Sequence, residues 1–203
     1  MAYDRETWTT EEFGTSHEGW VGVLVADGTV PPPAVFDTGS GSDVHQTSHW
    51  SVYDGHFAHI PRAAALRGMC SCGWSGPEHR LDWEAIGERD LEDAGGEQAD
   101  ECCDDWDGHT ATVEAATIPL PEAITALLDQ LEAEVGKLAA SSPLAAVRAV
   151  RRIESAAGAA GYWAARATQD DATPEQAAVA LGLSEAAARR ELARLGRWNL
   201  YRP

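Results

Sequence analysis

The chain has 203 residues, with 33 Asp and Glu against 15 Lys and Arg, which gives a formal net charge of −18. This length can bury a sizeable core in one domain or two small ones, and the composition excludes collagen-like and disulfide-dense scaffolds. Apolar runs are all shorter than the roughly 18 residues of a transmembrane helix. The opening stretch MAYDRETWTTEEF lacks the apolar core of a secretory signal, so we expect a cytoplasmic protein with no membrane partner.

The charge is unevenly distributed along the chain. Residues 141–203 hold nine Arg and six acidic residues, a local charge of +3. Residues 1–140 therefore hold the other 27 acids against six Lys or Arg, a local charge of −21. Such an acidic part repels phosphate backbones and membrane surfaces. It either keeps the protein in solution or docks onto a basic partner protein.

Residues 1–48 are predicted to form a polar leader, a short strand and a loop. The strand is the valine-rich run WVGVLV at 20–25, which the turn signal Asp27-Gly28 follows. Residues 31–48 combine three consecutive prolines with Thr, Gly, Ser and Asp, a composition typical of an extended loop.

This loop contains Asp37-Thr38-Gly39-Ser40 behind two apolar residues, which resembles the catalytic loop of retroviral-type aspartic proteases. Aspartic catalysis needs two carboxylates that share a proton, and the chain has one copy of the motif, so the resemblance implies a dimeric enzyme. The prolines at 31–33 cannot donate the backbone hydrogen bonds of a strand that enters such a loop, and no glycine-rich flap follows. We therefore predict a loop and a protein that is not an enzyme.

Residues 49–118 are predicted to form a small β-hairpin module. Its first strand is expected at 50–57 (WSVYDGHF), and its return strand leads from residue 61 into the first cysteine. Short helices are expected at 83–92 and 97–107. The module contains every cysteine of the chain.

Thiols and imidazoles gathered in a reducing compartment indicate metal ligands rather than disulfides. Four of them around one ion make a structural zinc site, and the candidate ligands are the four cysteines, His109, His79, Asp105, His56 and His59. No His-Glu-x-x-His signature occurs, which argues against a catalytic metal. The competing interpretation is four free cysteines packed as small apolar side chains.

The spacing of Cys70-Ser71-Cys72-Gly73-Trp74, followed by Trp106-Asp107-Gly108-His109, resembles small zinc-ribbon-like modules of uncharacterised high-GC bacterial proteins. The resemblance covers residues 50–112. It implies zinc bound by Cys70, Cys72 and His109, and it leaves the fourth ligand open. We predict Cys102 at the fourth position, and the alternatives are Cys103, Asp105, His56, His59 and His79.

From residue 119 onward the pattern is helical. Pro121-Glu122 opens one helix, and Ser142-Pro143 supplies an N-cap and a first-turn proline for the next. The first helix carries an apolar stripe with spacings of three and four residues, made of Ile124, Leu127, Leu128, Leu131, Val135 and Leu138. This stripe packs against the next helix or against a second copy of the chain, and we expect a homodimer.

Residues 173–195 have the pattern of a helix-turn-helix. The stretch TPEQ at 173–176 is typical of a capped helix start. Gly182 suits a left-handed turn after this helix, and Ser184 can cap the start of the second helix. The stretch resembles the helix-turn-helix segments of bacterial regulators and sigma-like factors, in which the second helix enters the major groove of DNA.

The second helix offers Arg189, Arg190 and Arg194, which we predict to contact double-stranded DNA, because arginine suits both phosphate and guanine. The sequence thus predicts an α+β protein, with a small β-hairpin zinc module followed by an all-α part that ends in the helix-turn-helix. The expected function is a zinc-containing transcriptional regulator of a high-GC bacterium. The alternative is an acidic protein–protein adaptor or nucleic-acid mimic whose C-terminal helices only dimerise.

Overall fold

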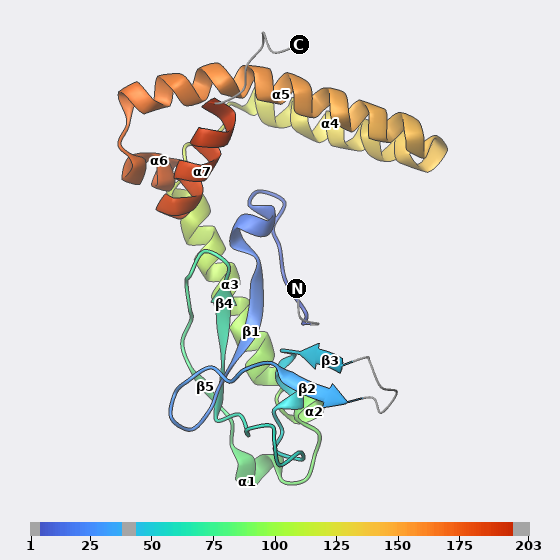
Figure 1. The fold of residues 1–203 in the computed structure, drawn as a ribbon, viewed down its shortest axis with the longest axis vertical. Helices are drawn as coiled ribbons and strands as arrows, with labels where there is room; N and C mark the ends of the chain where they lie inside the picture. Colours follow the sequence, from blue (N-terminus) through green and yellow to red (C-terminus); the bar gives the residue numbers. More distant parts are fainter. Residues whose placement is uncertain (1–4, 38–43, 197–203) are drawn as a thin grey trace. The chain divides into compact units, whose positions relative to one another are not determined.

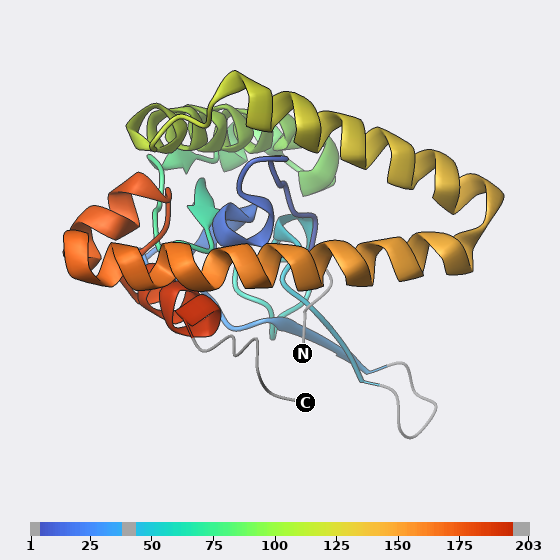
Figure 2. The ribbon, with the colours of Figure 1, turned by 90° about the horizontal axis from the view of Figure 1, so that it is seen from above.

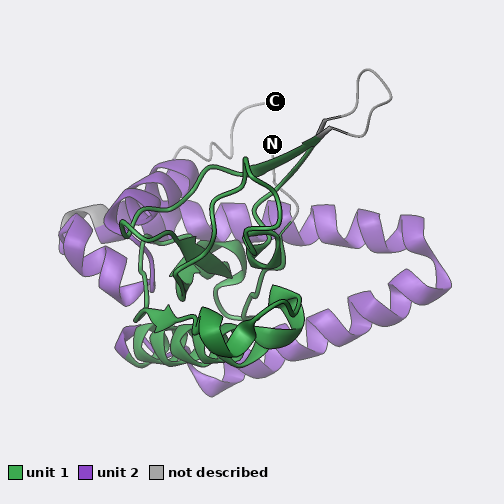
Figure 3. Cartoon of the chain, turned by 90° about the horizontal axis from the view of Figure 1, so that it is seen from below, with its two compact units in different colours: residues 1–115 green, residues 116–203 purple. Residues whose placement is uncertain are grey.

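The computed structural model describes residues 5–37 and 44–196 (Figure 1). The chain divides into an N-terminal unit, Met1–Ala115, and a C-terminal unit, Ala116–Pro203 (Figure 3). Two small antiparallel sheets of three and two strands lie in the N-terminal unit, and the other regular elements of the described residues are helices. The predicted α+β class is confirmed.

The larger sheet has the strand order β1-β4-β5 and is antiparallel. Its strands are β1 (Gly19–Leu24), β4 (Ala65–Cys70) and β5 (His79–Arg80). In β1 the β-branched residues Val21 and Val23 alternate with less buried positions, as expected of a strand with one face on the core. The register pairs Gly19 with Cys70, so the start of β1 meets the end of β4.

The partner of β4 differs from the predicted hairpin. The segment 50–57 forms a 3-10 turn, η2 (Trp50–Val52), and β4 pairs with β1 instead. Trp50 and Tyr53 are both buried and are three residues apart, a spacing that fits a helical turn rather than a strand. The prediction of a strand at 50–57 was wrong for this reason.

Residues predicted as loop form a small hairpin of β2 (Ala34–Asp37) and β3 (Val44–Thr47). The hydroxyl of Tyr53 donates a 2.9 Å hydrogen bond to the carbonyl of Pro32, which ties the start of this hairpin to the core. Thr38 and Gly39 of the protease-like motif lie outside the described residues.

Four helical segments complete the N-terminal unit: η1 (Gly14–His17), α1 (Trp83–Ile86), α2 (Leu91–Ala94) and α3 (Gly96–Ala116). α3 packs against β4 with almost no space between the two backbones. A Cβ placed on Gly68 of β4 would lie 2.6 Å from the carbonyl oxygen of Cys102 on α3. Glycine is therefore required at this crossing.

The C-terminal unit contains α4 (Glu122–Ser141), α5 (Pro143–Asp171), α6 (Pro174–Ala180) and α7 (Glu185–Gly196). Only Ser142 separates α4 from α5, so the two helices form an antiparallel hairpin, and Figure 2 shows them diverging away from this turn. None of the helices in the described ranges is long and apolar enough to cross a membrane.

Candidate metal centre and helix-turn-helix

A tight turn after β4 brings two cysteine thiols together. Cys70 ends the strand, its N–H bonds the carbonyl of Trp74 at 3.0 Å, and its carbonyl accepts from the N–H of Gly73 at 2.9 Å. Gly73 has φ of +98°, a conformation that suits glycine. The N–H of Trp74 points at the sulfur of Cys72, 3.4 Å away. The turn therefore presents Cys70 and Cys72 to the same space.

A third side chain comes from the N-terminal leader. His17 ends η1, two residues before β1 begins, and the pairing of Gly19 with Cys70 brings it alongside the cysteine turn. Ser71 holds the two segments together: its N–H bonds the carbonyl of Glu18 at 2.8 Å, and its hydroxyl donates to the carbonyl of Thr15 at 3.0 Å.

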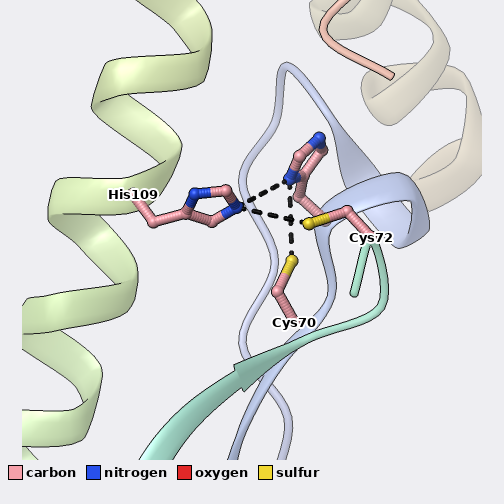
Figure 4. Close-up of side chains that lie close together, drawn as sticks. Cys70, Cys72 and His109 are labelled. Carbon is pink, nitrogen blue, oxygen red and sulfur yellow. Dashed lines mark hydrogen bonds between the residues drawn. The ribbon is translucent and has the colours of Figure 1, made fainter. Parts of the chain in front are cut away.

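His109 of α3 closes the group from the other side, so the side chains come from three separate segments (Figure 4). His17 Nδ1 lies 3.3 Å from His109 Nε2 and 3.6 Å from Cys70 Sγ, and Cys72 Sγ lies 3.4 Å from His109 Nε2. All four ligand atoms lie within 4.8 Å of one another. His17, Cys70, Cys72 and His109 form a group that could hold a metal ion.

The burial of this group sets its protonation. Burial, together with the adjacent Cys70, raises the pKa of Cys72 to about 11. Burial, together with the charge of His17, lowers the pKa of His109 below its usual value. Without an ion, the Cys72 thiol and the His109 imidazole are therefore neutral at neutral pH. A cation at its centre would compensate the buried thiolates and release their protons, which is the usual coupling of metal binding to ionisation.

Aromatic rings enclose the group. The indole of Trp74 stacks on His109 with ring centroids 4.5 Å apart, and Phe13 lies against His17 at 4.9 Å. His17 and Cys70 are each 3% exposed. Cys72 and His109 are half-buried, and the two sulfur and two nitrogen donors of the group are the number that a tetrahedral metal site takes.

Three of the four predicted ligands therefore meet, and Cys102 does not belong to the group. Its side chain is fully buried in the apolar core under β4, and burial raises its pKa to about 12. The short helix expected at 97–107 is in fact longer, because α3 continues to Ala116. Seven residues of unbroken helix keep Cys102 and His109 about 10 Å apart along the axis.

The other candidates for the fourth position are engaged elsewhere. His79 lies between two carboxylates of α3, at 2.7 Å from Glu101 and 2.6 Å from Asp105. His56 bonds Asp54 at 2.7 Å. Two further candidates also lie outside the group: His59, 3.3 Å from the carbonyl of Val35, and Cys103, which is half-buried on α3.

Sequence reasoning missed His17 because it gave β4 the wrong partner. The signal that would have found this ligand is the position of His17 immediately before the valine-rich strand at 20–25. Once that strand is paired with the one that ends in Cys70, a histidine just before it must lie beside the cysteines.

The helix-turn-helix has the predicted local geometry. Thr173 and Gln176 form a complete capping box at the start of α6. Gly182 has φ of +62° in the turn, and the hydroxyl of Ser184 accepts the N–H of Ala187 at 3.3 Å at the start of α7. These predictions of turn and caps are confirmed.

α5 supplies a third helix to this motif. The helices meet through small side chains, since Ala165 of α5, Ala177 of α6 and Ala188 of α7 are all buried. At Gly161 of α5 a Cβ would lie 2.7 Å from a methyl group of Leu195 on α7, so the two helices approach closely. The result is a three-helix unit with a tightly packed alanine core.

The three arginines of α7 are exposed and differ in their partners. Arg189 forms an ion pair with Glu185 at 2.5 Å, and Arg194 forms one with Glu191, each within the same helix turn. Arg190 has no carboxylate partner among the described residues. Arg189 and Arg194 are therefore held by carboxylates of α7, whereas the part of the chain that the structure describes gives Arg190 no such partner.

Comparison with protein-family models, with curated proteins and with solved structures finds no match for this chain.

Proposed function

We propose that the N-terminal unit is a structural zinc module. The observation that carries the proposal is the group of two cysteines and two histidines from three segments, whose four ligand atoms lie within 4.8 Å of one another. Zinc prefers four sulfur and nitrogen donors in such sites. Its binding would join η1, the turn after β4, and α3.

Inductively coupled plasma mass spectrometry of the purified full-length chain measures its metal content and tests this proposal. We expect about one zinc per chain, lost in Cys72→Ser and in His17→Ala. Cys103→Ser is the matched control, because Cys103 is a half-buried cysteine of α3 outside the group. A chain that keeps its zinc in His17→Ala but loses it in Cys102→Ala would contradict the proposed ligands.

We propose further that the C-terminal unit binds double-stranded DNA and that the protein is a zinc-containing transcriptional regulator. The supporting observation is the capped three-helix motif, whose last helix exposes Arg189, Arg190 and Arg194. Residues 1–115 hold 23 acids and five arginines, a charge of −18, so the C-terminal unit is neutral overall. Taken by itself, this unit therefore does not repel DNA through its net charge, whereas the N-terminal unit does.

Titration of fluorescent duplex fragments with the full-length chain, at two salt concentrations, tests this function. Arg190→Ala should weaken binding and reduce the salt dependence, because a phosphate contact releases about one counterion. Arg80→Ala, an exposed arginine of β5 in the other unit, is the matched control. Equal binding by both variants, or no binding at low salt, would overturn the proposal.

A second candidate, the acidic adaptor, is favoured by one feature of α3. Glu97, Asp100, Asp104 and Asp107 are all exposed and follow one another at spacings of three and four, so they share one face of the helix. Such a row suits a basic protein partner. If the chain binds no DNA but competes with DNA for a basic DNA-binding protein, the adaptor is the function.

A further inference from the structure

The helix α4 is only partly covered by α5, its neighbour in the same unit. It is 20 residues long, and none of its residues is buried. Ile124, Leu127 and Leu128 form the upstream part of its apolar stripe, and Leu127 is 61% exposed. A stripe that carries leucines along several turns without burying them is the face of a helix that lacks its partner.

The start of α5 continues this surface. Leu144, Val147 and Val150 are exposed, Leu144 by 86%. Between the two helices lies an apolar groove of about 380 Å³, lined by residues that include Leu131, Val135 and Ile153. Together, the exposed apolar side chains of α4 and of the start of α5 leave on the order of 500 Å² of apolar surface accessible per chain. This area is comparable with the roughly 800 Å² that each partner buries in a stable interface.

The charges of the two helices are opposite. α4 carries Glu122, Asp129, Glu132 and Glu134 against one lysine, a charge of −3. The segment 143–153 of α5 carries three arginines and no acid, a charge of +3. Among the described side chains of α4 and α5, the one ion pair joins Glu134 to Lys137, and both of these residues belong to α4. The opposite charges of the two helices are therefore not paired with each other within these described side chains.

We propose that this surface binds a second copy of the chain, with α4 of each copy against α5 of the other. Each hairpin would fill the groove of its partner, in a four-helix arrangement around a two-fold axis that runs along the helices. The reverse arrangement, with α4 against α4, would bring two helices of charge −3 together and is disfavoured by their repulsion.

This arrangement has a geometric consequence. With the axis along the helices, the two turns at Ser142 lie at the same end of the bundle, and the two helix-turn-helix motifs lie toward the other end. In the reverse arrangement the two Ser142 turns would be separated by the length of α4, about 30 Å for its 20 residues.

The first experiment measures the mass of the full-length chain in solution, without DNA, over a range of concentrations and salt. We expect a dimer that dissociates more readily as salt rises, because the helix charges attract across the interface. Leu127→Glu should give a monomer of unchanged helix content. Ala126→Glu is the matched control, since it adds the same charge to the next exposed position of α4, on the opposite face.

The second experiment tests the direction of the axis. Ser142→Cys in a Cys103→Ser background should be cross-linked to its partner copy by a short thiol-reactive linker. Three outcomes would overturn the proposal: a monomer at every concentration, a dimer that Leu127→Glu leaves intact, or a dimer that Ser142→Cys does not cross-link. A monomer that Leu127→Glu destabilises would show that the stripe is covered within the chain. All of these measurements are independent of DNA binding.

Discussion

The indole of Trp74 lies flat on the imidazole of His109, with ring centroids 4.5 Å apart and planes within 6° of parallel. Trp74 also donates its backbone N–H toward the sulfur of Cys72. One residue therefore orients two of the side chains of the metal-binding group, and it does so from the same short turn that supplies the cysteines.

Replacing Trp74 should accordingly weaken metal binding. Groups that orient metal ligands change affinity by about 10-fold to 100-fold when they are removed, and we expect about 10-fold for Trp74→Ala. Trp74→Phe should retain most of the affinity, because a phenyl ring can still stack on the imidazole of His109. Competition titration with a zinc-sensitive dye measures the zinc affinity of each variant. An equal loss of zinc affinity in Trp74→Ala and Trp74→Phe would show that ring stacking on His109 does not contribute to metal binding.

Removal of the metal should lower the stability of the N-terminal unit, because the ion would join η1, the turn after β4 and α3. A strong chelator should lower the unfolding temperature of the full-length chain by several degrees, and added zinc should restore it. In Cys72→Ser the chelator should have no further effect. An unfolding temperature that does not respond to the chelator in the zinc-loaded chain would contradict a stabilising role.

Two glycine substitutions should change stability in opposite directions. Gly68→Ala places a methyl group 2.6 Å from the carbonyl oxygen of Cys102, so α3 must move away from β4, at a cost of about 1–3 kcal/mol. Gly108→Ala meets nothing within 4 Å inside α3 and should stabilise the chain by about 1 kcal/mol. Urea denaturation measures both changes in the free energy of unfolding.

The same variants test whether α3 is continuous. If the helix ended at Gly108 instead, alanine there would not stabilise the chain, and the position of His109 in the metal-binding group would need another explanation. Zinc content provides the second measurement: Gly68→Ala should reduce it, since His109 moves with α3, whereas Gly108→Ala should leave it unchanged.

Freeing the arginines of α7 should increase DNA affinity. Arg194 lowers the pKa of Glu191 through their hydrogen bond, so this carboxylate is charged at neutral pH and competes with phosphate for the guanidinium. Glu185→Gln and Glu191→Gln remove these competitors, and each should raise affinity by up to about 5-fold, the range of an exposed ion pair. Glu122→Gln on α4 removes the same charge far from α7 along the chain and serves as the control in the DNA titration.

Overpacking the alanine core should destabilise the helix-turn-helix. Ala188 is fully buried where α7 meets its neighbours, and Ala188→Leu should cost about 1–3 kcal/mol because three carbon atoms have no space. Ala186→Leu, on the exposed side of α7, should change the free energy of unfolding by less than about 0.5 kcal/mol. Equal effects of the two substitutions would contradict the packing of this unit.

Sequence alone was sufficient for features that depend on neighbours along the chain. The capping box of Thr173 and Gln176, the turn at Gly182 and the thiol pair Cys70 and Cys72 all join residues within three positions of one another, so their geometry is set by local backbone conformation. The periodic stripe of α4 likewise predicted a helix, because the 3.6-residue period is a local property.

The tertiary structure decided what depends on pairing between distant segments. WVGVLV and WSVYDGHF are both short apolar runs, and nothing local determines which of them pairs with the strand that ends in Cys70. In the structure, the segment with Trp50 and Tyr53 buries these two side chains in the core, and β1 pairs with β4 instead. That pairing brings His17 to the cysteines in place of Cys102. The fourth ligand is thus a consequence of strand pairing, which depends on the packing of the whole unit.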